Sequence, residues 1–324
     1  MRAVRHHQFG PPERVLRCEA VDAPPPGPGA VLVRLAARPI NPSDLLGVAG
    51  EYGPEIALPA VPGFEGVGTV AAIGPDTAAP PPGTRVLALR GGGTWAEYVA
   101  VPAEYLVAVP DAIADELACQ LYINPLTAWF MLTRAVAARP GDVILANAGG
   151  SAFCRALAQF CRHRGVQLVA VTRSPAYDEA LRALGAEVVN ESREDVAAAV
   201  ARLARGPVVA AFDAVGGASG SALARCLPPG GTMLYYARLS RQALDLTEAE
   251  IAARGIKIAG YWLRQWVNRA TPAEWHAAFA ELMAVAVRIG LVMPVAARFD
   301  LSDIAAAARA AQAPGRDGKV LLVG

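Results

Sequence analysis

Hydrophobic residues follow two different patterns along the chain. Residues 1–117 hold short apolar runs, such as AVLVRLAARPIN and WAEYVAVP, separated by turn sequences such as PPPGPG and APPPGTR. Short apolar runs between proline and glycine turn signals are typical of antiparallel β structure. We therefore predict that this part forms a barrel-like, mostly antiparallel β domain.

From about residue 118 the pattern changes to apolar strands that alternate with helical stretches. Such alternation predicts βαβ units around a parallel sheet, and six strands make a complete dinucleotide-binding sheet. After residue 260 come two helical segments and a last strand, KVLLVG, which we expect to return to the first domain. The prediction is an α/β protein with a catalytic domain of residues 1–117 and 262–324 and a nucleotide-binding domain of residues 118–261. The six predicted strands are DVILANA, VQLVAVTR, AEVVN, VVAAFDAVGG, GTMLYYA and IKIAG.

Composition and charge narrow the class of partner. Of the 324 residues, 54% are hydrophobic and 18% charged, and the net charge is +1. No large uniform field is present to attract nucleic acid or acidic lipid. The chain has no apolar run of about 18 residues and no signal-peptide core near its first residue. We expect a cytoplasmic protein that acts on small molecules, with neither nucleic acid nor membrane as a partner.

Cysteine and histidine do not form a metal-binding pattern. The five cysteines are scattered and never spaced as C-x-x-C, and no two histidines have the spacing of a helical metal motif. We therefore expect buried thiols and no metal site.

The segment ILANAGGSAFCRALAQF (144–160) predicts a strand, a turn of small residues and a helix. Small residues let the backbone approach a pyrophosphate, and the helix N-terminus supplies N–H donors. Strict G-x-G-x-x-G is absent, since Gly149 and Gly150 are the only glycines and Cys154 replaces the last one. An ordinary strand–turn–helix is the alternative, but the strands that follow favour dinucleotide binding.

The end of the second strand of this domain indicates which dinucleotide is bound. NAD sites tend to place a carboxylate there for the ribose hydroxyls. This strand instead ends in Thr172, Arg173, Ser174 and Pro175. Arg173 and Ser174 suit a 2′-phosphate, which favours NADPH over NADH. The alternative is a solvated surface arginine.

Several motifs resemble the medium-chain dehydrogenase/reductase superfamily over essentially the whole chain. Within it the chain is most similar to the 2-enoyl thioester (trans-2-enoyl-CoA/ACP) reductases, through GEYG, INPLTAWFML and AGYWLRQW, with the quinone oxidoreductases as near neighbours. The resemblance implies a Rossmann domain with a doubly wound, parallel six-stranded sheet and a GroES-like catalytic domain. The motifs that carry it are INPSD (40–44), PAVPGFEGVGTVAAIG (59–74), PGTRVLAL (82–89), INPLTAW (123–129), the 144–160 turn and AVGG (214–217).

Positions that hold zinc in metal-dependent members of the superfamily carry other residues here. Those members place Cys before a polar pair and His in PGHEG, whereas this chain has Asn41-Pro42-Ser43-Asp44 and Phe64. It also lacks their four-cysteine lobe. Because thiolate and imidazole ligands are missing, the resemblance implies a zinc-independent enzyme.

Without a metal, reduction of an enoyl thioester needs a hydrogen-bond donor near the developing enolate and a source for the α-proton. A tyrosine suits this role because an ordinary tyrosine, with a pKa of about 10, is protonated at neutral pH. Tyr52 lies in a Gly/Pro loop and matches the proton-donating tyrosine of the enoyl thioester reductases. The alternative is a tyrosine packed under the loop, its hydroxyl merely satisfied.

The resemblance assigns further residues one at a time. Tyr236 to Leu239 fall where the family usually has Tyr-Gly-Gly-Met, so the loop's shape, and whether Arg238 meets cofactor or substrate, stay open. Helix capping, packing or solvation are the alternatives for several of these residues. The implied cofactor-binding residues are Asn124, Thr127, Gly150, Ser151, Ala152, Phe153, Arg173, Ser174, Pro175, Tyr236, Ala237, Arg238, Leu239, Tyr261, Trp262, Leu263 and Lys319, and the substrate-side residues are Asn41, Trp262 and Trp266.

Three functions follow from these expectations. The first is an NADPH-dependent, zinc-independent reductase of 2-enoyl thioesters, with hydride to the β-carbon and a proton from Tyr52 to the α-carbon. The second is an NADPH:quinone or enone oxidoreductase, and the third is a non-catalytic NADPH-binding protein. A homodimer through the exposed strand near residues 256–260 is expected.

Overall fold

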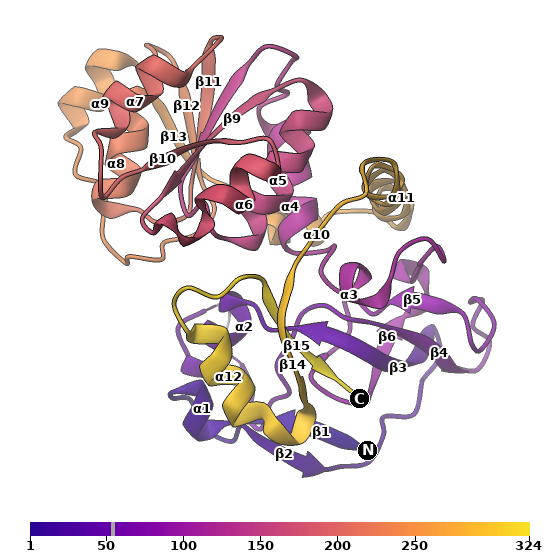
Figure 1. Ribbon diagram of the computed structural model, residues 1–324. Coiled ribbons are helices and arrows are strands. Elements are labelled where there is room, and N and C mark those ends of the chain that lie inside the picture. Colours follow the sequence, from indigo (N-terminus) through magenta and orange to yellow (C-terminus); the bar gives the residue numbers. More distant parts are fainter. Residues whose placement is uncertain (53–55) are drawn as a thin grey trace. The chain divides into compact units, whose positions relative to one another are not determined.

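The computed structural model describes residues 1–52 and 56–324, and the chain divides into two compact units (Figure 1). The first unit contains Met1–Ile123, Ala270–Val287 and Val292–Gly324. The second contains Asn124–Arg269 and Arg288–Leu291. Chain segments from both ends of the sequence therefore build the first unit.

A seven-stranded sheet forms the centre of the first unit. Its order is β14-β15-β3-β4-β5-β7, with β6 also paired to β3, and only β14 and β15 run parallel. This confirms the mostly antiparallel β architecture. The strands are β3 (Ala30–Pro39), β4 (Val67–Ile73), β5 (Arg85–Leu87), β6 (Tyr98–Pro102), β7 (Val107–Ala108), β14 (Val295–Asp300) and β15 (Lys319–Val323), beside a two-stranded sheet of β1 (Arg2–Arg5) and β2 (Arg17–Ala20).

Alternation along β3 explains how this sheet buries one face. Val31, Val33 and Leu35 are buried, and they pack with residues such as Val70 and Val99 from the neighbouring strands. Period-two alternation is what a sheet with one covered face requires. The helices of this unit are α1 (Pro12–Val15), α2 (Pro42–Ala49), α3 (Asp115–Ala118), α12 (Ile304–Gln312) and most of α11 (Pro272–Ile289).

The second unit is built on a parallel sheet with the order β10-β9-β8-β11-β12-β13. This is the strand order of a complete dinucleotide-binding fold, and the predicted count of six strands is confirmed. The strands are β8 (Val143–Ala146), β9 (Gln167–Thr172), β10 (Glu187–Asn190), β11 (Val208–Asp213), β12 (Thr232–Tyr235) and β13 (Lys257–Gly260).

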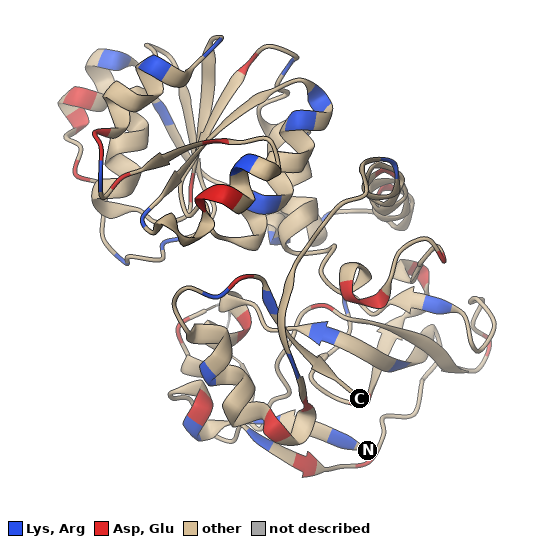
Figure 2. Ribbon diagram, viewed as in Figure 1, with Lys and Arg blue, Asp and Glu red and all other residues tan. Residues whose placement is uncertain are grey.

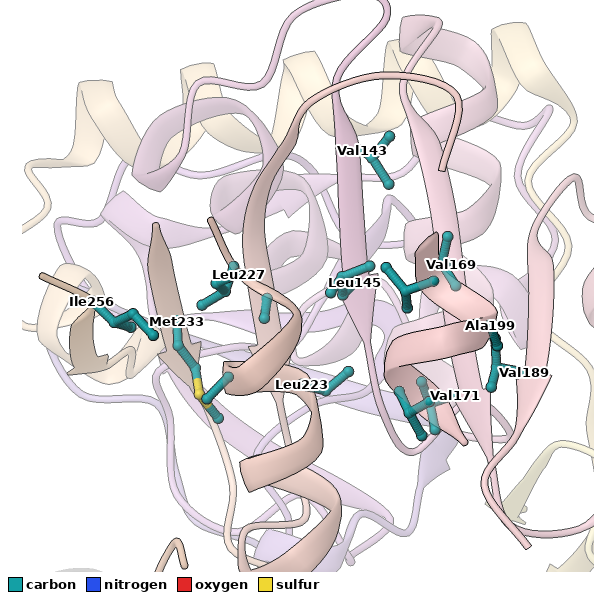
Figure 3. Packing of buried hydrophobic residues seen from close by; sticks show 14 residues of the cluster. Val143, Leu145, Val169, Val171, Val189, Ala199, Leu223, Leu227, Met233 and Ile256 are labelled. Atoms are coloured by element: carbon teal, nitrogen blue, oxygen red, sulfur yellow. The ribbon is translucent and has the colours of Figure 1, made fainter. Parts of the chain in front are cut away.

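Helices cover the sheet of the second unit because its strands are apolar on both faces. On one face, Val143 and Leu145 of β8 pack with Ala199 of α7 and Leu223 of α8 (Figure 3). All four residues of β8 are fully buried. The helices are α4 (Asn124–Phe130), continued by a π-helical turn at Met131–Ala135, then α5 (Ala152–Arg164), α6 (Asp178–Ala183), α7 (Val196–Leu203), α8 (Gly217–Cys226), α9 (Glu248–Arg254) and α10 (Leu263–Val267).

Charged residues of both signs are scattered over the helices of both units (Figure 2). In the described part of the chain, no helix has the length and apolar character needed to cross a bilayer.

Candidate functional site

The turn between β8 and α5 presents a helix N-terminus at the carboxyl end of the sheet. Ser151 caps the 13-residue α5, its Oγ accepting a hydrogen bond from the Cys154 N–H at 3.1 Å. Ala148 has a left-handed φ of 51°, and a Cβ on Gly149 would lie 2.6 Å from Cγ2 of Thr172. The turn is therefore tight. Ala152 and Phe153, the first residues of the helix, follow the cap, where N–H groups and the helix dipole favour an anion.

Two tyrosines border this turn. The ring of Tyr177 is so close to Gly150 that a Cβ there would lie 2.6 Å from it. The ring of Tyr236 stacks on Phe153 with centroids 4.0 Å apart, and its buried hydroxyl lies beside the Ser151 side chain. Burial raises the pKa of Tyr236 well above its ordinary value, so the hydroxyl is a donor. Small residues, a helix N-terminus and a protonated phenol fit the phosphates of a dinucleotide. The sequence analysis did not predict a role for Tyr177. Its only sequence signal is that an aromatic residue closes the segment TRSPAY after the strand.

The end of β9 carries a positive charge. Arg173 follows the strand directly and is exposed, while Ser174 caps a short 3₁₀ turn over Pro175–Tyr177. The nearby carboxylate of Asp178 accepts a hydrogen bond from the Thr172 hydroxyl at 2.9 Å. A cation at this position suits a phosphate on the ribose.

A buried polar pair, which the sequence did not predict, joins β8 to β11. Nδ2 of Asn147 donates to Oδ1 of Asp213 at 2.5 Å, and Oδ1 of Asn147 accepts the Ala214 N–H at 2.8 Å. The same Asp213 oxygen accepts the N–H groups of Val215 and Gly216 at 2.9 and 3.0 Å. The pair therefore fixes the turn after β11 beside the turn after β8. The strand-end polar residues in ILANA and AFDAVGG were its only sequence signal.

The loop after β12 has a defined shape without the family's glycines. Tyr236 N–H donates to the Asp213 carbonyl and Leu239 N–H to the Ala214 carbonyl, both at 2.9 Å. Ala237 is half-buried and Arg238 exposed, and the Leu239 side chain is 55% exposed. Backbone pairing with the turn after β11 thus holds the loop.

Aromatic residues follow β13. Trp262 is 43% exposed and meets the ring of Tyr235 edge-on at 5.6 Å. Trp266 meets Phe130 of α4 edge-on at 4.8 Å. Tyr261 and Leu263 are half-buried, and burial raises the pKa of Tyr261 to about 12.

Asn124 and Thr127 lie one turn apart near the start of α4, so they share one helix face. Asn124 is half-buried and Thr127 is buried.

A fully buried polar cluster lies inside the first unit. Nδ2 of Asn41 donates to Glu65 Oε1 at 2.7 Å, and Lys319 Nζ donates to Oδ1 of Asn41. The Asn41 N–H donates to Asp44 at 2.7 Å as part of the cap of α2, and Glu65 Oε2 accepts the Ile123 N–H at 3.0 Å. Burial is the main cause that raises the pKa values of Asp44 and Glu65 to about 7 and lowers that of Lys319 to about 8. Lys319 and Asn41 are thus brought together.

Tyr52 and Phe64 lie beside each other in the same unit. Their ring centroids are 6.3 Å apart with the planes at 67°. Tyr52 is half-buried and Phe64 is 41% exposed, whereas Glu65, the next residue, is buried. A Cβ on Gly63 would lie 2.4 Å from the Thr94 hydroxyl, so only glycine fits at this position without a clash. The sequence GFEG therefore presents Phe64 outward and Glu65 inward. Within residues 1–52 and 56–324, no three His, Cys, Asp or Glu side chains gather as a metal site would require.

Two family models match separate parts of the chain. Residues 27–111 match the alcohol dehydrogenase GroES-like domain model, and residues 155–284 match the zinc-binding dehydrogenase model. The chain is 32% identical to the mitochondrial enoyl-[acyl-carrier-protein] reductase of Bos taurus, over 99% of this chain and 88% of that protein.

Solved structures give the same result. A putative NADPH:quinone reductase from Bacillus thuringiensis has a TM-score of 0.94 and 37% identity, covering 100% of this chain and 98% of that one. A mycobacterial protein solved in complex with NADPH has a TM-score of 0.90 and 27% identity, covering 100% of both chains. The chain therefore belongs to the medium-chain dehydrogenase/reductase family, near its enoyl reductases and quinone oxidoreductases.

Proposed function

We propose that the protein is a zinc-independent, NADPH-dependent reductase of 2-enoyl thioesters. The observation that carries the proposal is the pairing of Tyr52 with Phe64. Phe64 occupies the position at which metal-dependent members have a ligating histidine, and a phenyl ring cannot ligate zinc. Without a Lewis acid, another group must stabilise the negative charge and supply the proton. A phenol beside that position would do both.

NADPH is the cofactor that the second unit favours. The mycobacterial relative was solved with NADPH, and here Arg173 rather than a carboxylate follows β9. When bound, NADPH supplies the hydride that adds to the β-carbon. Gly150, Ser151, Ala152 and Phe153 would hold the pyrophosphate, and the Tyr236 hydroxyl would donate to it.

Residues of this chain would then complete the reduction. Addition at the β-carbon places negative charge on the thioester oxygen, and the Tyr52 hydroxyl would donate its proton to the α-carbon. Asn124 and Thr127 would contact the nicotinamide side of the cofactor. Asn41, whose side-chain amide is hydrogen-bonded to Glu65 and Lys319, would form a rigid part of the wall of the substrate site.

Quinone reduction is the second candidate. It is favoured by the relative from Bacillus thuringiensis, whose structure has 37% identity to this chain. The same cofactor would serve, and the two functions differ in the acceptor.

The test measures NADPH oxidation with crotonyl-CoA, a longer enoyl-CoA and a soluble quinone. Tyr52→Phe should lower kcat with the thioesters about 100-fold or more, because it removes the proton donor. Tyr98→Phe, which removes a hydroxyl from β6 of the same unit, is the matched control. Activity with quinone alone would replace the first function by the second. NADPH binding without turnover of any acceptor would indicate a non-catalytic role.

A homodimer is part of the proposal. β13 is an edge strand of the parallel sheet among the described residues, and an open edge can pair with a second copy. Light scattering would measure the mass directly.

A further inference from the structure

The two adjacent tyrosines at the end of β12 point to opposite faces of the sheet. Tyr236 stacks on Phe153, beside the turn that begins α5. Tyr235 instead contacts Trp262 and, 4.9 Å from its ring centroid, the guanidinium of Arg238. Met233, two residues before Tyr235, packs in the core with α8, which places Tyr235 on that face. The Arg238 guanidinium therefore lies on the face of this sheet opposite to Phe153 and the turn between β8 and α5.

This group of side chains is open to solvent. Trp262 is 43% exposed, the neighbouring Leu239 is 55% exposed, and Arg238 is exposed. Among residues 1–52 and 56–324, none forms an ion pair with Arg238. The cluster of Arg238, Tyr235 and Trp262 thus presents one uncompensated cation beside two aromatic rings.

The surrounding chain is basic although the whole protein is nearly neutral. Residues 214–244 and 251–273 contain no Asp or Glu, and exposed arginines, among them Arg238 and Arg264, follow both β12 and β13. Both loops lie at the carboxyl ends of parallel strands, where open α/β sheets bind their ligands. The ligand that this edge favours is an anion.

We infer that the cluster of Arg238, Tyr235 and Trp262 binds the phosphate-bearing end of a coenzyme A thioester, an inference that rests on the proposed thioester reductase. A guanidinium that contacts a ring and has no carboxylate partner can still donate through its N–H fork to two phosphate oxygens. An exposed indole offers a stacking surface for adenine. Coenzyme A carries both groups, whereas a carrier protein offers a single phosphodiester and no base.

The test compares substrates that share the crotonyl thioester and differ in the carrier. Crotonyl-CoA has phosphates and adenine, and crotonyl-N-acetylcysteamine has neither. Arg238→Gln should raise KM for crotonyl-CoA about tenfold, the loss expected for one charged hydrogen-bonded contact. It should leave kcat, the KM for NADPH and kcat/KM for the N-acetylcysteamine thioester unchanged. Arg139→Gln, an exposed arginine elsewhere in the second unit, is the matched control.

Several outcomes would overturn the inference. An equal loss with both thioesters would place Arg238 in the fold or at the reacting end, and a raised KM for NADPH would place it on the cofactor. A loss confined to a crotonyl-carrier protein would assign the cluster to that partner, and a changed mass in light scattering would assign it to a subunit interface. If the wild type reduces no thioester, the proposed function itself fails. If it reduces both and Arg238→Gln spares crotonyl-CoA, only the inference fails.

Discussion

The side-chain ammonium of Lys319 donates a hydrogen bond to the amide oxygen of Asn41. Both residues are buried, and Glu65 and Asp44 complete the cluster with two carboxyl groups around one ammonium. Such a cluster is costly to form, and its hydrogen bonds through Asn41 hold it together, although Oδ1 of Asp44 has no hydrogen-bond partner among the described residues. Its partners come from α2, the strand β15 and the segment before β4, so it fixes these parts of the first unit to one another.

Removing the cation should destabilise the first unit. Lys319→Met leaves the two buried carboxyls without a positive partner, and we expect a loss of about 3 kcal/mol in the free energy of unfolding. Urea unfolding followed by circular dichroism measures it. Lys257→Met, which changes an exposed lysine, should have almost no effect. Equal stability of both variants would show that the ammonium does not support the cluster.

The cluster also predicts a pH dependence. Burial raises the pKa of Glu65 from an ordinary 4.5 to about 7, so the folded protein binds this proton more tightly than the unfolded chain. The stability that Glu65 contributes is therefore full below its unfolded pKa and lost as pH rises through about 7. The advantage of wild type over Glu65→Gln in urea unfolding should shrink between about pH 5 and pH 8.

Glu97→Gln is the control for this dependence. Hydrogen bonds from Arg2 lower the pKa of Glu97, so its contribution is lost only as pH falls toward the acid range. The difference between wild type and Glu97→Gln should therefore stay flat where that of Glu65 changes. A flat profile for both variants would contradict the raised pKa of Glu65.

Arg173 should decide between the two nicotinamide cofactors. If its guanidinium meets the 2′-phosphate, Arg173→Gln should raise the KM for NADPH about tenfold or more and leave the KM for NADH unchanged. Steady-state rates with each cofactor at saturating acceptor measure this. Arg164→Gln, at the exposed end of α5, is the control. A wild type that uses both cofactors equally would remove the role of Arg173.

Replacing Asn147 by a carboxylate beside Asp213 should destabilise the protein. Asn147→Asp is nearly isosteric but would place two buried carboxyl oxygens where a 2.5 Å hydrogen bond now lies. We expect a loss of about 3 kcal/mol at neutral pH and recovery in acid, where the two groups can share a proton. Thermal unfolding at both pH values measures it, with the exposed Asn268→Asp as control. Loss at neither pH would mean that the turn relaxes around the new charge.

Local pattern predicted the elements of the second unit because each strand is short, apolar and bounded by turn signals. VQLVAVTR, for example, contains β9 (Gln167–Thr172), and IKIAG contains β13 (Lys257–Gly260). The resemblance added the positions of Tyr52 and the cofactor turn. These predictions depended on nearest neighbours and on spacing, which a sequence displays directly.

The buried polar contacts could not be read in this way. Lys319 lies 278 residues from Asn41, and Asn147 lies 66 residues from Asp213. A lysine or asparagine between apolar residues can be either buried or solvated. Only the folded sheet decides between the two. The opposite orientations of Tyr235 and Tyr236 likewise depend on where β12 ends.

The burial of Lys319 has a practical consequence. The chain contains only two lysines, and arginine supplies its other long basic side chains. With one ε-amine enclosed in the first unit, Lys257 on the open edge of β13 is the accessible lysine for acylating reagents. A fluorophore coupled there would mark a single lysine on the strand proposed to pair, so its emission would report directly whether that edge is covered in solution.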